Sequence, residues 1–334
     1  MVIDVSDERI LIKNINNDIL AFQPNKKLGI LLSFVCLFLL GILPIISNSR
    51  PASFSAEDYT LFLSFWQVLF ATPLLIVSII KPENGIFDKT IPKNLKNKTL
   101  GVILITSILF LFSTFLYVLT FEKAGTINAA IAVQSFPVFT IILETFFLSK
   151  KKNTIELLLT GMLVIALIYL GTGGTFILQN LSFWFLLALG VPLLWSIAHL
   201  TIKHYMEKAS ITPAQIIFFR VAIVSIILVV TLLIVKGPTL LINEFLSPGL
   251  QIYALVMGLV YYLELYNWFY AIKNIDVSIA GSITTPTPAL TMILALLFLD
   301  EMLFSYQLIA LVIVFASLYG ILYYDTKKGK KLTN

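Results

Sequence analysis

The chain has 334 residues, of which 58% are hydrophobic and only 12% are charged. Soluble domains carry about 25% charged residues, so this composition excludes an ordinary soluble protein and indicates an integral membrane protein. The net charge of +5 gives no reason to expect a nucleic-acid partner, because the basic residues gather in particular loops. The cysteine Cys36 and the two histidines, His199 and His204, are too few for a disulfide framework or a soft metal cage.

The first 27 residues are polar and contain no short apolar core before a small-residue cleavage site, so they do not resemble a cleavable signal peptide. We expect them to form a cytoplasmic N-terminal lead. Ten apolar spans follow, each near the roughly 20 residues that a helix needs to cross a bilayer. We place them at residues 28–48, 60–80, 100–121, 126–148, 154–174, 183–204, 213–235, 249–271, 276–299 and 305–324. The expected fold is therefore all-α, with ten transmembrane helices.

The basic residues predict the orientation of these spans. With both termini in the cytoplasm, nineteen of the 23 lysines and arginines lie in inner segments, and three, Arg50, Lys123 and Lys236, lie in outer loops. The remaining one, Arg220, lies within a span. We therefore expect a multi-pass protein of the cytoplasmic membrane, whose second five spans enter inverted with respect to the first five.

The stretch around span 4 is repeated 151 residues downstream. Pro137 aligns with Pro288 without a gap, and six of the twelve positions from 137 to 148 are identical in the two copies. The three lysines at 150–152 are replaced by Asp300 and Glu301 in the second copy. A duplicated span that exchanges a basic end for an acidic one is predicted to insert the other way up.

The same offset extends over nearly the whole chain. Pro44 aligns with Trp195 and Tyr117 with Trp268, while spans 2 and 7 match at an offset of 153. The chain is thereby divided into a lead at 1–27, a first repeat at 28–174, a second repeat at 183–324 and a basic cytoplasmic tail at 325–334.

This layout resembles the drug/metabolite transporter (DMT) superfamily, in particular its ten-span type with two EamA-like repeats. The residues that carry the resemblance are Trp195, Tyr-Ala-Ile-Lys-Asn at 270–274, Pro137, Pro288 and Leu-Asp-Glu at 299–301. The chain departs from the family with Leu-Ser-Lys at 148–150, where an acid is usual, and with Gln67, where members often carry an arginine like Arg220. The resemblance implies a secondary transporter for a small organic metabolite, such as an amino acid, an amine or a related solute. It implies no enzyme, catalytic residue or cofactor.

Ionisable side chains within spans are costly and need a reason. They are Glu144, His199, Arg220 and Glu264. From the rise per residue, Arg220 and Glu264 lie roughly 10 and 12 Å from the cytoplasmic edge on adjacent antiparallel spans, which predicts an ion pair. The alternatives are a pair that holds two helices together, or groups that face a cavity and meet substrate or a proton. We interpret His199 as a satisfied or snorkelling histidine and Glu144 as a boundary charge.

Glu264 belongs to a stripe of three residues. Tyr261, Glu264 and Trp268 lie at i, i+3 and i+7, on one face of a helix. Aromatic rings beside a carboxylate suit an organic cation, an amphoteric amine or an aromatic solute. Ordinary aromatic packing near a membrane interface is the alternative.

Prolines mark two predicted helix breaks, at Pro137 and at Pro286 and Pro288. Each proline leaves the carbonyl four residues earlier without its donor, which hydrocarbon tolerates only where other polar groups meet that carbonyl. Gln134, Thr284 and Thr285 stand at the breaks, and Tyr117 and Trp268 could wall a site beside them. Matched breaks in inverted halves predict a mid-membrane binding site, with a packing kink as the alternative.

The rival function is a membrane-embedded transferase with a lipid or prenyl substrate. Metal-diphosphate chemistry needs clustered acids, but Asp4 and Asp7 form the only DxxD spacing and lie in the lead. We therefore expect no metal site. The expected partners are a small-molecule substrate and the lipid bilayer. The sequence is compatible with transport coupled to a proton and with exchange for another solute. It is also compatible with a homodimer through spans 5 and 10.

Overall fold

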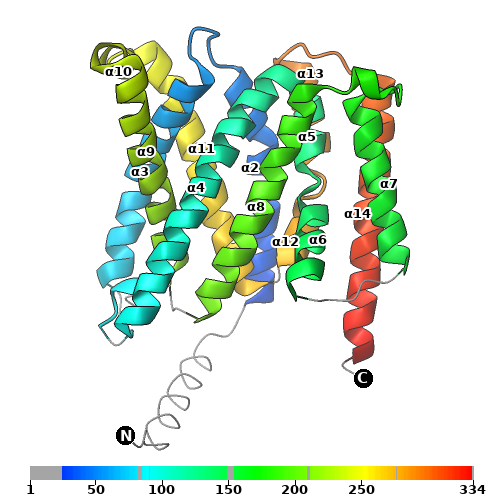
Figure 1. Cartoon of the computed structure of the whole chain (residues 1–334), viewed down its shortest axis with the longest axis horizontal. Helices are drawn as coiled ribbons and strands as arrows, with labels where there is room; N and C mark the ends of the chain where they lie inside the picture. The colour runs from blue at the N-terminus through cyan, green and yellow to red at the C-terminus, as the bar shows by residue number, and fades with distance from the viewer. Residues whose placement is uncertain are drawn as a thin grey trace, which may run out of the picture.

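The computed structural model describes residues 25–80, 85–89, 91–148, 154–208, 211–275 and 277–332, and these residues form a bundle of helices without a strand (Figure 1). The predicted lead, up to residue 24, lies outside them. We call the face at which the last helix ends the C-terminal face, and the other the opposite face. The first described helix also begins at the C-terminal face.

The helices of the first repeat are α2 (Lys26–Asn48), α3 (Ala56–Ile80), α4 (Lys93–Ala124), α5 (Thr126–Val133), α6 (Phe136–Leu148) and α7 (Thr154–Gly171). Those of the second repeat are α8 (Phe183–Lys208), α9 (Pro213–Lys236), α10 (Pro238–Phe245), α11 (Pro248–Asn274), α12 (Val277–Thr284), α13 (Thr287–Phe298) and α14 (Ser305–Leu332). Short 3-10 turns, η1 (Gly85–Phe87) and η2 (Leu178–Asn180), lie in connections. The pairs α5–α6 and α12–α13 each form one broken span.

The predicted ten-span fold is confirmed. Nine segments of the described chain are long and apolar enough to cross a membrane, and Ser305–Ile321 of α14 is a shorter apolar helix. The short helix α10, between spans 7 and 8, was not predicted from the sequence. This short helix begins with Pro238 after Gly237, whose φ of +80° lies in the left-handed region that glycine tolerates.

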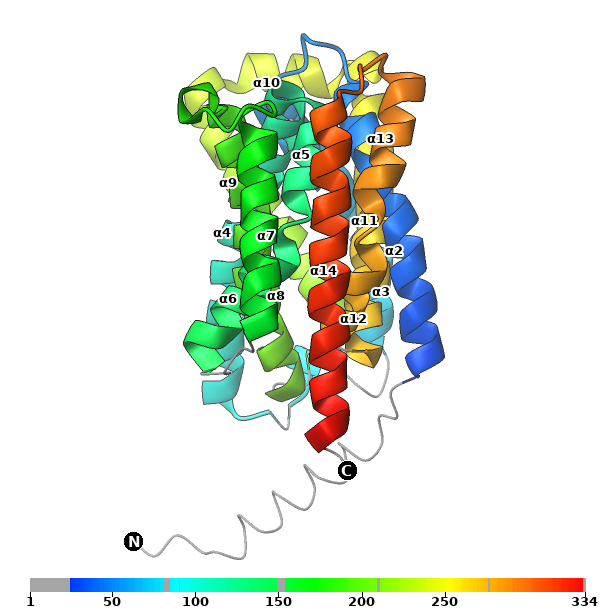
Figure 2. The ribbon, with the colours of Figure 1, turned by 90° about the vertical axis from the view of Figure 1, so that its right-hand side faces the viewer.

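The packing of the helices follows the inverted repeat. α2 packs along α11, and its counterpart α8 packs along α4, the counterpart of α11. Equivalent helices also meet each other, α3 with α9 and α7 with α14. The α7–α14 pair stands at the right-hand edge of the bundle in Figure 1 and faces the viewer in Figure 2. A pseudo-twofold axis between the halves explains all four contacts, because it exchanges one repeat for the other.

Close contact across the repeats brings α2 against α13. A Cβ atom at Gly41 of α2 would lie 2.5 Å from Leu290 Cδ2, so a larger residue here would have to displace the Leu290 side chain. The hydroxyl of Thr291, the next residue on α13, donates to the Gly41 carbonyl at 3.1 Å. The two halves therefore meet tightly beside the broken span α12–α13.

Candidate functional site

Both broken spans are interrupted where the sequence places its prolines. α5 ends at Val133 and α6 begins at Phe136, while α12 ends at Thr284 and α13 begins at Thr287. The prolines start the second segment of each span, where a missing N–H costs no intrahelical bond. The Thr284 carbonyl is not left free, because the Thr287 hydroxyl donates to it at 2.6 Å. A hydroxyl thus replaces the backbone donor that proline lacks.

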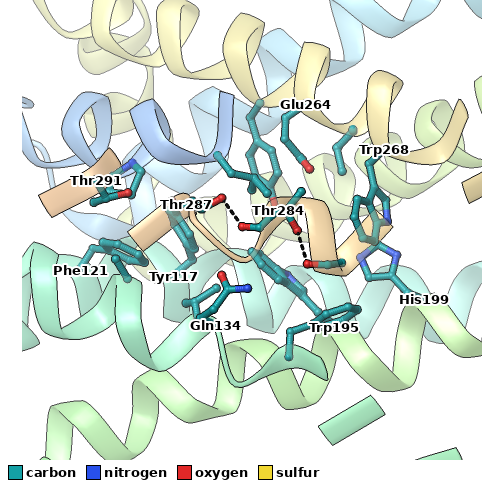
Figure 3. Close-up of a pocket in the computed structure, with 18 of the residues that line it drawn as sticks. Tyr117, Phe121, Gln134, Trp195, His199, Glu264, Trp268, Thr284, Thr287 and Thr291 are labelled. Carbon is teal, nitrogen blue, oxygen red and sulfur yellow. Dashed lines mark hydrogen bonds between the residues drawn. The ribbon is translucent and has the colours of Figure 1, made fainter. Parts of the chain in front are cut away.

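A cavity lies between the two repeats at the level of these breaks (Figure 3). It is lined by Leu40, Pro44, Tyr117, Phe121, Ala130, Val133, Gln134, Phe136, Trp195, His199, Arg220, Tyr261, Glu264, Leu265, Trp268, Gly281, Thr284, Thr287 and Thr291. Five pairs among them are related by the offset of 151: Pro44–Trp195, Tyr117–Trp268, Ala130–Gly281, Val133–Thr284 and Phe136–Thr287. Since repeat-related residues face one space, the cavity lies on the pseudo-twofold axis.

The structure brings most of the sequence-predicted site residues to this cavity. Tyr117, Gln134, Tyr261, Glu264, Trp268 and Thr284 all line it. Thr285 is not among the lining residues, which corrects its expected place in the site. Its fully buried hydroxyl donates to the Gly281 carbonyl at 3.1 Å and so closes the end of α12.

The predicted ion pair between Arg220 and Glu264 is wrong, since no ion pair within 4.0 Å joins them although both side chains are described. The Arg220 Nη2 donates instead to the Tyr261 hydroxyl at 3.2 Å. Its Cζ lies 3.4 Å from the ring centroid of Phe110, which holds the guanidinium by a cation–π contact. Both residues line the same cavity, but their charged groups are not in contact with each other.

The carboxylate of Glu264 points towards the cavity from α11 (Figure 3). The residue is only 5% exposed, and no ion pair within the described chain involves its side chain. The carboxylate, guanidinium and imidazole that line the cavity, from Glu264, Arg220 and His199, all belong to the second repeat. The first repeat supplies apolar and aromatic walls and the amide of Gln134. This arrangement offers a buried anionic group to a cation and a guanidinium to an anion.

Aromatic rings wall the rest of the cavity. Tyr117 stacks on Trp195 with centroids 6.0 Å apart, and Trp268 meets Phe136 edge-on at 6.2 Å. The buried ring nitrogens Trp195 Nε1, Trp268 Nε1 and His199 Nδ1, like Arg220 Nη1, have no hydrogen-bond partner. Buried polar groups are normally paired, so unpaired nitrogens around one cavity indicate that a ligand or water completes them.

Sequence reasoning missed some lining residues, chiefly Trp195, His199, Phe136, Thr287 and Thr291. His199 was interpreted as a satisfied or snorkelling histidine, but it lies in the cavity wall with its ring 5.6 Å from that of Trp268. The signal for Trp195, Phe136 and Thr287 was the repeat offset itself, which relates each of them to another lining residue. The side chain of Glu144 lies outside the described side chains.

A bundle of inverted repeats with broken spans around a buried cavity defines the class of small-solute membrane transporters. The comparisons agree with this class: the model of the EamA-like transporter family matches residues 27–172 and 182–323, and the chain belongs to this family. No curated protein matches the chain. A solved crystal structure of a protein with 13% sequence identity has a TM-score of 0.60 and covers 89% of this chain and 98% of its own, a likeness that concerns the fold alone.

Proposed function

We propose that the chain is a secondary transporter that moves a small organic metabolite, an amino acid, an amine or a related solute, across the cytoplasmic membrane by alternating access. The observation that carries this proposal is the cavity lined by five pairs of repeat-related residues beside two broken spans. A site on the pseudo-twofold axis stays in place while one repeat rocks against the other, so it can open to each side in turn.

The chemistry of the cavity supports the substrate class. A substrate ammonium group would meet the Glu264 carboxylate and the faces of Tyr117 and Trp268, where cation–π attraction is strong when water is excluded. An anionic group would meet the free Nη1 of Arg220. Glu264 is also the residue that would carry a proton if transport is proton-coupled, and an exchanged solute is the alternative form of coupling.

Uptake of radiolabelled amino acids and amines into proteoliposomes tests this proposal, after a thermal-shift screen has selected solutes that stabilise the purified protein. Wild-type protein is expected to transport at least one selected solute, and Glu264→Gln is expected to abolish that transport. Phe298→Ala is the control, because Phe298 is 68% exposed and is not among the residues that line the cavity. Ligand-dependent release of a product from lipid, without transport, would favour the transferase instead.

The orientation follows from the charge distribution and is part of the proposal. We propose that the C-terminal face is cytoplasmic, because α4, which carries Lys93, Lys96 and Lys98 in its first turns, begins at that face and the basic end of α14 lies there. Cysteine replacement of Lys93 in a Cys36→Ser background should make the site reactive only from the cytoplasm. Labelling of Lys93→Cys from outside alone would reverse the orientation. The α7–α14 edge is the surface proposed for a homodimer, and crosslinking there would test it.

A further inference from the structure

Glu301 connects the two repeats at the opposite face. Its Oε1 accepts from the backbone N–H of Thr126 at 2.9 Å, and its Oε2 accepts from that of Ile127 at 3.3 Å. These are the first two N–H groups of α5, which have no partner within the helix. Gly125 at the N-cap supplies no side chain to cap them. A carboxylate from the second repeat therefore caps a helix of the first, where the helix dipole favours negative charge.

Further hydrogen bonds surround this contact. Gln307 Nε2 of α14 donates to the Asn128 side-chain oxygen of α5 at 2.9 Å, a second bond between the repeats. Within the first repeat, Asn48 Nδ2 donates to the Thr126 hydroxyl at 2.8 Å and to the Phe121 carbonyl at 2.9 Å. The start of α5 is thus fixed to α2 and α4 on one side and to the α13–α14 connection on the other.

This contact lies over the end of the cavity that faces the opposite side. The lining residues Phe121 of α4, Ala130 of α5 and Thr291 of α13 are only 1%, 5% and 0% exposed. Thr126 and Ile127, which receive Glu301, are 0% and 1% exposed. α5 packs directly against α13 at this end of the cavity. Opening the cavity on this side therefore requires α5 to separate from the second repeat.

We infer that Glu301 is the latch that keeps the cavity closed at the opposite face, and that its bonds to Thr126 and Ile127 must break before this face can open. The inference rests on the proposed alternating access. Both acceptor bonds are charge-assisted, and both cross the boundary along which the halves would move. The ion pair of Arg50 with Glu122, at the same face, joins α4 to the connection after α2 within one repeat and would move with it.

The test measures opening of the cavity directly, independently of any substrate. Thr291→Cys in a Cys36→Ser background places one thiol in the closed end of the cavity, and a membrane-impermeant maleimide is added to intact cells. Lys123→Cys, whose side chain is 45% exposed at the opposite face, shows whether that face is outside. If it is inside, the same labelling is carried out on inverted vesicles.

Glu301→Gln keeps the size of the side chain but removes its charge and one acceptor oxygen. Labelling of Thr291→Cys is expected to become roughly two- to tenfold faster, the range for loss of a charge-assisted helix cap. Glu122→Gln is the matched control and should leave the rate unchanged. Unchanged labelling in Glu301→Gln, with the protein folded by size-exclusion chromatography and thermal unfolding, would overturn the latch.

A second variant removes the donor instead of the acceptor. Thr126→Pro deletes the N–H that Glu301 Oε1 receives, and proline is suited to the first helical position. The preceding Gly125 has ψ 145°, within the range that proline accepts in its neighbour, and its φ of +85° is one that glycine adopts readily. Thr126→Val loses the hydroxyl but keeps the N–H. Faster labelling in Thr126→Pro than in Thr126→Val supports the latch, and equal rates contradict it. Wild-type transport that fails for every solute would instead count against the proposed function and leave these rates interpretable.

Discussion

The guanidinium of Arg220 lies over the ring of Phe110, with Cζ 3.4 Å from the ring centroid. Tyr261 is the other aromatic residue beside it, at 5.9 Å, and occupies the position equivalent to Phe110 in the second repeat. The charge is therefore held between repeat-related aromatic side chains. Nη2 is bound to the Tyr261 hydroxyl, which fixes one edge of the guanidinium. Nη1 has no partner, so the other edge is available to a ligand.

This geometry predicts that lysine cannot replace Arg220. A lysine keeps the charge but loses the planar group that stacks on Phe110 and bonds to Tyr261. Arg220→Lys is expected to lower the free energy of unfolding by about 1–3 kcal/mol, the scale of a lost charge-assisted bond together with its cation–π contact. Denaturant unfolding of the purified protein in detergent measures this loss. An unchanged midpoint would mean that neither contact contributes to stability.

Glu264 gives the contrasting prediction, because no ion pair with Arg220 is formed. Glu264→Gln should leave the unfolding midpoint nearly unchanged, since the substitution removes a buried charge and breaks no ion pair within 4.0 Å. Breaking a true buried pair would cost about 3–5 kcal/mol. The same variant should lose transport of cationic or amphoteric solutes in proteoliposomes. A large loss of stability would restore the ion-pair interpretation.

The fold could be predicted from sequence patterns because the strongest signals of this fold in the sequence are long and regular. Apolar runs located most of the spans to within about four residues, although α4 begins at Lys93 instead of residue 100 and α14 continues to Leu332 instead of ending at residue 324. The 151-residue offset with its exchange of lysine for acid indicated the inverted halves. The pairing of Arg220 with Glu264 could not be obtained in this way, because depth along an axis does not specify which way a side chain points. Nor could the capping role of Glu301, which depends on two segments 175 residues apart meeting at one face.

The cavity residues likewise divide into those that the sequence could predict and those that it could not. Tyr117 and Trp268 were recognised from their repeat alignment, whereas Thr285 was placed in the site because it stands at a break. In a helix end, the hydroxyl of a threonine can turn back to a preceding carbonyl, as that of Thr285 does to Gly281. Proximity in sequence to a break therefore predicts position near the site but not contact with it.

Glu244 of α10, outside the membrane spans, gives a prediction of pH dependence. Burial raises the pKa of Glu244 above its ordinary value, and the negative charge of Asp58 raises it further while Lys236 partly opposes the shift. The folded state therefore keeps a proton that the unfolded chain releases near pH 4.3. The stability from this proton is fully present below the unfolded pKa and is lost as pH rises through the folded pKa.

Thermal unfolding between pH 4 and pH 8 measures this effect. Glu244→Gln, which cannot ionise, should lose less stability than wild-type protein as pH rises through this range. Glu57→Gln is the control, because Glu57 is exposed in the first turn of α3 beside Asp58. Parallel curves for wild type and Glu244→Gln would show that the folded environment of Glu244 does not favour its protonated form.

The walls of the cavity give the last prediction. Trp268→Ala removes the ring that packs on Phe136 and His199, and Gln134→Ala removes an amide beside the break in the first repeat. Each variant should reduce the rate of transport of any solute that wild type carries, by roughly tenfold or more for the loss of one stacking or hydrogen-bonding contact of about 1.4 kcal/mol. Initial rates in proteoliposomes, normalised to protein content, measure the change. Expression and elution volume should stay at the wild-type level, as for Phe298→Ala. If both variants transport at the wild-type rate, the substrate does not contact this cavity, and the site must be sought elsewhere between the repeats.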